Sequence, residues 1–148
     1  MVSQIMKTII IKGSPVEIFP MWENFESFPL FMKHIISVRK SDDQSSHWMM
    51  GLGFKTWLKW DARLTDLKEN RRIAWSTISG DVKTSGQVTF RGLDQNETQV
   101  TVHMQYVPPL GRFGELIIRW LVDPERKIEE DLKMFKRHAE TIGNFSKR

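Results

Sequence analysis

Histidine is the side chain of this sequence with the clearest capacity to bind a metal ion, because the chain contains no cysteine. No histidines pair at the spacing of metal ligands: His34, His47, His103 and His138. His103 shares one face of a predicted strand with Gln99 and Gln105, which indicates a histidine on the polar surface of a sheet. We therefore expect no metal site and no cofactor.

Two acidic and two basic residues, Asp61, Arg63, Asp66 and Arg72, form the second group that could do chemistry. In a sheltered site such side chains act as general acids and bases. Residues 56–66, however, alternate between apolar and polar, which places Asp61 and Arg63 on the exposed side of a strand. Exposed ion pairs contribute only ~0–1 kcal/mol. We therefore interpret the group as solvated cross-strand pairs.

The remaining motifs indicate neither phosphate binding nor covalent catalysis. The two glycines of residues 51–53 lack the third glycine and the Gly-Lys-Ser/Thr ending of a phosphate loop, and no helix is predicted to follow them. We interpret this segment as a bulged hairpin. No serine has the sequence context of a nucleophile elbow, and there is no cysteine to act as nucleophile.

Length and composition favour one globular domain. The 148 residues suffice for a hydrophobic core, so we expect a single domain over residues 1–148. The net charge of +4 would suit an acidic partner, but the basic residues are spread along the chain, and nucleic acid is not expected as a partner. The lack of cysteine, of a secretory signal and of an apolar run of membrane-spanning length favours the cytoplasm.

The longest predicted element is a helix over residues 111–142. Its apolar residues recur at steps of four, three, four and three, the spacing of one helix face: Ile128, Leu132, Phe135, Ala139 and Ile142. Charged residues occupy the opposite face: Glu129, Glu130, Lys133, Lys136 and Arg137. Pro124 cannot donate a backbone hydrogen bond, so it either kinks this helix or restarts it with Asp123 as N-cap.

The first half of this helix, residues 112–122, is apolar on almost every side. Leu116 and Trp120 point away from Ile118 and Val122, so one packed interface cannot bury both sets. Two interpretations follow. Either this half forms a gate that moves while the second half stays anchored, or the whole helix is packed along its length and only kinked.

The first predicted strand covers residues 3–12. We expect Ile5, Ile9 and Ile11 on one face and Lys7 facing away.

A short helix is predicted to follow, with Ser14 as N-cap, Pro15 at its first position and Glu17 in its first turn. Pro20 should disturb this helix early. A short aromatic segment, residues 25–32, comes next.

From His34 onward the apolar residues recur at every second position, which predicts six more strands. They cover residues 34–40, 46–52, 56–66, 73–77, 84–91 and 97–107. Short connections imply hairpins and an antiparallel order. One face of the sheet is apolar and must be covered. The predicted fold class is therefore α+β: a curved antiparallel seven-stranded sheet wrapped around a long C-terminal helix, with two short helices after the first strand.

Seven short segments match a known family in order and spacing: residues 13–19, 25–32, 60–62, 73–76, 86–90, 98–102 and 131–136. Together they resemble the START-like (helix-grip) superfamily, and within it the polyketide cyclase/dehydrase and coenzyme Q-binding branch, also called SRPBCC. Coenzyme Q-binding members usually have a Leu-Pro-Trp-Cys-like segment where this chain has Phe-Met-Lys-His-Ile at residues 31–35.

The resemblance implies a cavity between the long helix and the concave sheet that holds a hydrophobic ligand. Bulky side chains, most of them on the inner face indicated by the alternation, are the ligand-binding residues we expect: Phe28, Phe31, Trp48, Met50, Leu58, Trp60, Trp75, Phe90, Met104, Tyr106, Leu116 and Trp120. The polar groups that an aromatase/cyclase needs inside its cavity are few on this face, mainly Thr77 and Tyr106.

Three functions are compatible with this sequence. The first is a carrier or sensor that buries a hydrophobic small molecule or lipid without chemistry, with a membrane surface as a further partner. The second is an enzyme of the polyketide cyclase, aromatase or dehydratase type that acts by positioning. The third is a module that binds a macromolecule, as in the ribosome-associated toxins of this fold. Inward polar residues would favour the second, and gathered basic residues the third.

Overall fold

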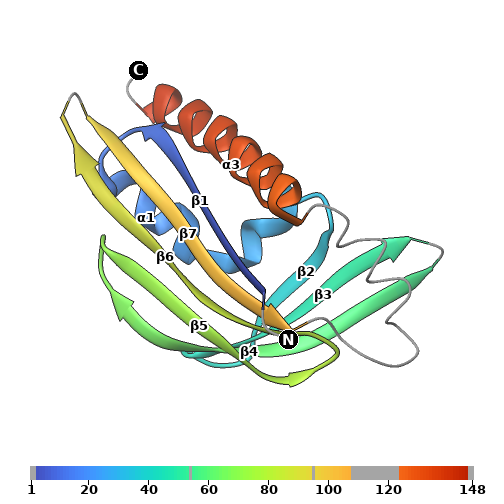
Figure 1. Cartoon of the computed structure of the whole chain (residues 1–148). Helices are drawn as coiled ribbons and strands as arrows, with labels where there is room; N and C mark the ends of the chain where they lie inside the picture. The colour runs from blue at the N-terminus through green and yellow to red at the C-terminus, as the bar shows by residue number, and fades with distance from the viewer. Residues whose placement is uncertain (1–2, 54, 95, 108–123, 147–148) are drawn as a thin grey trace.

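The computed structural model describes residues 3–53, 55–94, 96–107 and 124–146, which form a curved sheet with helices on its concave side (Figure 1). The elements in chain order are β1 (Ser3–Lys12), α1 (Pro15–Glu23), the 3₁₀ helix η1 (Phe25–Leu30), β2 (Ile35–Lys40), β3 (Ser45–Gly53), β4 (Thr56–Lys68), β5 (Arg72–Gly80), β6 (Lys83–Leu93), β7 (Glu97–Val107) and α3 (Pro124–Ser146). This arrangement confirms the predicted helix-grip fold.

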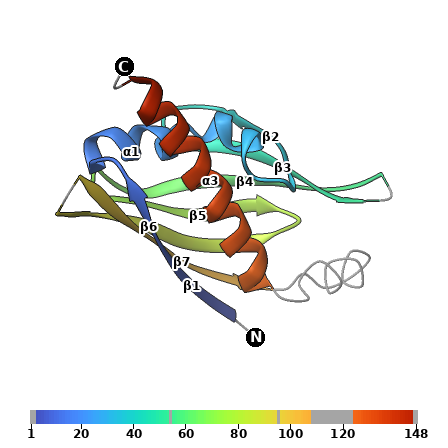
Figure 2. The same cartoon turned by 90° about the horizontal axis from the view of Figure 1, so that it is seen from above.

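The sheet contains seven antiparallel strands in the order β1-β7-β6-β5-β4-β3-β2. Strands β2 to β7 follow one another as hairpins, and β1 then pairs with β7. The chain therefore has to cross from one edge of the sheet to the other between β1 and β2, and α1 and η1 make this crossing on the concave side (Figure 2). Helix α3 lies across the same side, so the concave face is the covered one.

Helix α1 begins as its sequence predicts. Ser14 precedes it in an extended conformation, and the Glu17 carboxylate accepts hydrogen bonds from the Ser14 backbone N–H (3.4 Å) and hydroxyl (3.2 Å). The expected early disturbance at Pro20 is wrong, because α1 continues to Glu23. Pro20 removes only the hydrogen bond to the carbonyl of Val16, a residue that is 66% exposed and can be hydrated instead.

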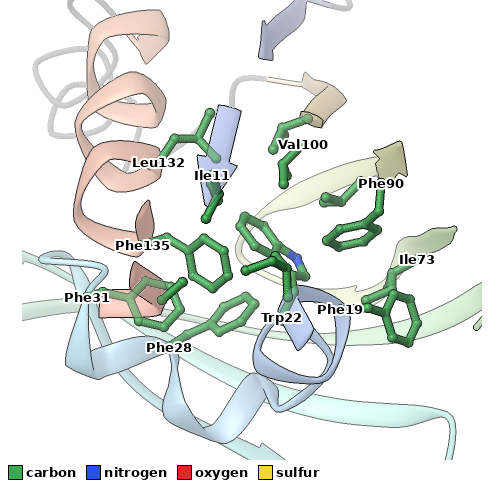
Figure 3. Packing of buried hydrophobic residues seen from close by; sticks show 14 of the residues in the cluster. Ile11, Phe19, Trp22, Phe28, Phe31, Ile73, Phe90, Val100, Leu132 and Phe135 are labelled. Carbon is green, nitrogen blue, oxygen red and sulfur yellow. The ribbon is translucent and has the colours of Figure 1, made fainter. Parts of the chain in front are cut away.

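Aromatic rings form the centre of the hydrophobic core (Figure 3). The indole of Trp22 makes edge-to-face contacts with the rings of Phe135, at 4.7 Å between centroids, Phe28, at 5.5 Å, and Phe90, at 6.5 Å. Each such pair adds ~0.5–1.5 kcal/mol beyond the apolar area that it buries. Trp22 therefore ties α1 to η1, to the sheet and to α3.

Helix α3 packs through its apolar face, where Leu132, Phe135 and Ala139 are buried. The packed face ends there, since Ile142 is 42% exposed.

The side of the helix covers the free edge of β1. Lys136 Nζ donates a 2.6 Å hydrogen bond to the carbonyl of Ile10, and Glu140 accepts one of 3.0 Å from the backbone N–H of Lys12. These contacts satisfy an edge that could otherwise pair with another chain.

The prediction that Lys7 faces away from the isoleucines of β1 is wrong. Lys7 pairs with Val102, whose side chain is buried on the concave face, so the alternation places both residues on that face. The ammonium group of Lys7 lies 3.6 Å from a carboxylate oxygen of Glu125 and 3.8 Å from one of Glu129. Its long aliphatic stem lets the charge reach the acidic start of α3 at the rim of the sheet.

Helix α3 begins at Pro124. The N–H that proline lacks would have no partner within the helix at this first position, so its absence costs nothing. The predicted apolar half-helix and gate over residues 112–122, and the predicted cap at Asp123, lie outside the described residues.

Removal of a ring from the core should destabilise the fold strongly. Phe90 is 6% exposed and packs edge-on against Phe19 at 5.2 Å. We expect Phe90→Ala to lower the free energy of unfolding by ~3–5 kcal/mol in a denaturant melt. The matched control is Trp57→Ala, because Trp57 is 48% exposed and should change stability by less than ~0.5 kcal/mol. Equal effects of the two substitutions would contradict the assignment of the faces.

Candidate ligand cavity

A cavity of about 220 Å³ lies between the concave sheet and the helices. Every strand contributes to its wall, and so do α1, η1 and α3, and most of the lining side chains are apolar. The cavity is thus the part of the covered face that the helices do not fill.

Eight of the twelve predicted ligand-binding residues line the cavity: Phe28, Trp48, Met50, Leu58, Trp60, Trp75, Met104 and Tyr106. Phe31 and Phe90 point to the covered side as predicted, but their rings pack in the core instead, Phe31 against Phe135 at 5.1 Å and Phe90 against Phe19 and Trp22. Leu116 and Trp120 lie outside the described residues. Whether the eight residues bind a ligand remains a prediction.

Two stacked indoles form a flat part of the wall. Trp48 on β3 is paired with Trp60 on β4, and their rings lie 5.9 Å apart at 12° to each other. The Trp48 Nε1–H donates a 2.8 Å hydrogen bond to the Ser46 hydroxyl, which fixes the orientation of the ring. Phe25 and Phe28 of η1 contact Trp48 from the helical side, at 6.0 and 5.6 Å between ring centroids. The wall therefore contains two nearly parallel aromatic rings.

The second part of the wall comes from α3, through Ile128, Asp131 and Leu132. The helical stripe predicted that Ile128 and Leu132 face the sheet. It did not single out Asp131, because an acidic residue beside an apolar stripe is usually solvated. The available signal was its position, three residues after Ile128 and four before Phe135, on the border of the buried face.

Asp131 is the electrostatic exception in this cavity. Burial among apolar side chains, and to a smaller extent the negative charge of Glu130, raise the pKa of its carboxyl group to about 6. Within the described part of the chain, no hydrogen bond or ion pair holds this carboxyl group. Asp131 is therefore a titratable group that faces an apolar space near neutral pH.

His34, which precedes β2, also lines the cavity. Burial is the main cause that lowers the pKa of its imidazole, and the positive charges of Lys33 and Lys127 lower it further, whereas Glu130 acts in the opposite direction. The imidazole is therefore neutral at pH 7 and above.

The threonine hydroxyls near the cavity are hydrogen-bonded to the backbone of the protein. Thr77, which the sequence placed on the inner face, exchanges two hydrogen bonds with the backbone of Thr84: its hydroxyl donates to the carbonyl (2.9 Å) and accepts from the N–H (3.0 Å). The Thr84 hydroxyl donates to the carbonyl of Gln105. Tyr106 does line the cavity, as expected.

The acidic and basic residues of β4 form partly exposed pairs, as the sequence predicts. Asp66 binds Arg72 at 3.3 Å. Asp61 binds the imidazole of His47 (2.8 Å) and the hydroxyl of Ser79, and the hydrogen bond from His47 is the largest cause of its lowered pKa. Arg63 donates to the side chain of Gln44 (2.9 Å), although part of Arg63 also borders the cavity.

The glycine motif also follows its prediction. Between Gly51 and Gly53 the register of β3 and β4 shifts, which is the expected bulged hairpin. The residues described here contain no group of three or more histidine, aspartate or glutamate side chains that could hold a metal ion.

The raised pKa of Asp131 predicts a pH-dependent stability difference. A carboxyl group with a folded pKa of about 6 and an ordinary value of 3.8 favours the folded state below pH 3.8, and this contribution disappears as the pH rises through 6. The difference corresponds to at most about 3 kcal/mol, and partial exposure reduces it to about 1–2 kcal/mol. We expect Asp131→Asn to be more stable than the wild type by that amount at pH 7.5, and about equal to it near pH 4.

Denaturant melts at the two pH values would measure this difference. Glu129→Gln is the control, since it removes the same charge from an exposed position on the same helix. A stability gain of Asp131→Asn that is the same at both pH values would show that titration of Asp131 is not its cause.

Comparison with known proteins agrees with this geometry. The family model described as "Polyketide cyclase / dehydrase and lipid transport" matches residues 11–127. An uncharacterized 17.2 kDa protein of Streptomyces lincolnensis is 30% identical over 132 residues, which cover 88% of this chain and 86% of that protein.

Two solved structures show the same fold. The Zhui aromatase/cyclase of a Streptomyces species has a TM-score of 0.78 and 17% identity, with 95% of this chain and 94% of that chain covered. A START superfamily protein of Mycobacterium smegmatis has a TM-score of 0.69 and 17% identity, with coverage of 94% and 98%. The chain therefore belongs to the polyketide cyclase/dehydrase and lipid transport family and shares the helix-grip fold of these structures.

Proposed function

We propose that this chain, as a single START-like domain over residues 1–148, binds a hydrophobic small molecule or lipid in its cavity and acts as a carrier or sensor without chemistry. The cavity wall carries the proposal, because the stacked Trp48 and Trp60 and the methionines Met50 and Met104 form an apolar, adaptable surface around about 220 Å³ of space.

The size of the cavity sets the scale of binding. A ligand that buries roughly 200 Å² of its apolar surface there gains about 5 kcal/mol from that burial. Part of this gain is lost to the restricted motion of the bound ligand. Burial of this area alone therefore gives binding in the millimolar range for a small apolar molecule, and additional polar contacts would tighten it.

The engagement of the inward polar groups supports a carrier over an enzyme. Ser46 accepts the indole N–H of Trp48, and the hydroxyls of Thr77 and Thr84 are bonded to backbone groups. These hydroxyls serve the wall of the cavity and are not poised to attack a substrate.

Asp131 is the observation that favours the second candidate, an enzyme of the cyclase or dehydratase type. A carboxyl group with a pKa of about 6 in an apolar cavity can exchange a proton near neutral pH, as a general acid or base must. Catalysis would then require a substrate oxygen or carbon within reach of this one group.

The ion pairs favour neither candidate and do not support a macromolecule-binding surface. Lys133, Lys136 and Arg126 are each paired with a glutamate one turn away on α3, while Arg72 pairs on the sheet.

In the described residues no helix is long and apolar enough to cross a membrane. A location in the cytoplasm is part of the proposal, based on the cysteine-free composition.

Blocking the cavity should abolish binding. Ala62 is 4% exposed and borders the cavity, so Ala62→Phe should fill part of the space and weaken ligand binding at least about tenfold. Ala74 lies on the opposite face of the neighbouring strand, and Ala74→Phe is the matched control that should bind as the wild type does.

The measurement is a titration with fatty acids, fatty alcohols, isoprenoid quinones and polycyclic aromatics, followed by tryptophan emission and by the melting temperature. The indoles of the cavity wall make the emission sensitive to a bound ligand, and a ligand that binds the folded state must raise the melting temperature. A panel that leaves both quantities unchanged would rule out the carrier function. Product formation from any bound compound would instead favour the enzyme.

A further inference from the structure

Asp131 is the acidic side chain among the described residues that line the cavity. Ile128 and Leu132 border the cavity beside it on α3, and the segment that leads into β2 adds His34 and Ile35. The carboxyl group is thus held against a mainly apolar surface by a helix that the core anchors through Phe135.

No cation in the described part of the chain compensates this carboxylate. The influences on its pKa are burial, which is the larger, and the negative charge of Glu130, and both disfavour ionisation. His34 is neutral because its own pKa is lowered. Arg63 borders the cavity, but its guanidinium group donates to the side chain of Gln44. Arg63 does not contribute to the pKa shift of Asp131. Above its pKa of about 6, Asp131 therefore places a negative charge at this end of the cavity.

A buried polar group without a partner usually marks a place where something else supplies one. A ligand that covers Asp131 removes its remaining water, and an ionised carboxylate without a hydrogen bond is costly in an apolar space. A ligand hydroxyl can replace that water, because its O–H donates to the carboxylate in a charge-assisted hydrogen bond. A ligand carboxylate cannot do so, since it has no proton to donate and adds a second negative charge.

We propose that Asp131 makes the cavity selective for uncharged ligands, and that the ligand class it takes is an apolar molecule with a hydroxyl group that donates to the Asp131 carboxylate. This inference rests on the proposed ligand binding. It excludes simple fatty acids and other apolar carboxylates as preferred ligands at neutral pH.

Three compounds with one aromatic skeleton test the selectivity: 2-naphthalenemethanol, 2-naphthoate and 2-methylnaphthalene. Their dissociation constants are measured at pH 8 by equilibrium dialysis, where both Asp131 and 2-naphthoate are ionised. We expect the wild type to bind the alcohol about 10- to 100-fold more tightly than the carboxylate, the range expected for two like charges in a partly buried site. The hydrocarbon should bind more weakly than the alcohol, because it leaves the carboxylate without a donor.

Asp131→Asn has nearly the same shape without the charge, and it should narrow the alcohol-to-carboxylate ratio to less than about threefold, mainly through tighter binding of 2-naphthoate. Glu129→Gln removes an equal charge from the exposed side of the same helix and should retain the wild-type ratio.

Each other outcome has a defined meaning. Equal binding of the alcohol and the carboxylate by the wild type would overturn the selectivity and leave the proposed carrier function in place. A ratio that Asp131→Asn does not change would overturn the assignment to Asp131. Failure of all three compounds to bind would overturn the carrier function for this ligand size, and the selectivity with it.

Discussion

A sheet with one apolar face and too few helices to cover it is the constraint on which this structure depends. Seven antiparallel strands curl around a single long helix, and α1 and η1 cover part of what α3 leaves open. Trp22 joins these covering elements, since its ring contacts η1 through Phe28, α3 through Phe135 and the sheet through Phe90. A fixed contact among three covering elements sets their distance from the sheet. The space that they cannot fill is then a stable feature of the fold.

The division of the buried residues follows from the same constraint. One cluster contains the ends of β1, β6 and β7 packed against α1 and α3, with side chains such as Ile11, Val100 and Phe135 fully buried. A second, small cluster on β3 and β4 contains Leu58 and Trp60 and is separate from the first. The first cluster is the larger one and provides most of the packing, whereas residues of both clusters line the cavity, among them Trp22 and Leu132 of the first and Leu58 and Trp60 of the second. The same apolar face of the sheet therefore supplies both the core and the cavity wall.

The alternation of apolar residues was sufficient to predict the face of almost every strand residue, because sheet geometry fixes that relation. The alternation could not predict which part of each strand the helices cover. Phe90 shares a face with cavity residues, but the helices cover its part of the strand, so it belongs to the core. The prediction for Lys7 was wrong for another reason: its charge suggested the exposed face, although its position in the alternation places it on the covered face. Its salt bridges to α3 show that a long side chain can begin on the covered face and still bring its charge to the rim. Asp131 was missed because its position on the helix is clear only once the sheet is in place.

Asp131 is a position where the residue present conflicts with the stability of the fold. Stability alone would favour an apolar or amide side chain at this position, since burial raises the pKa of the carboxyl group to about 6. The buried residues of α3, Leu132, Phe135 and Ala139, are all apolar, so the partly buried Asp131 is an exception on the packed side of this helix. A cost of this kind has a physical reason if the carboxylate gains a partner when the cavity is occupied. The aromatic wall then sets the shape of the ligand, and one charge on the helix decides which polar group the ligand can have.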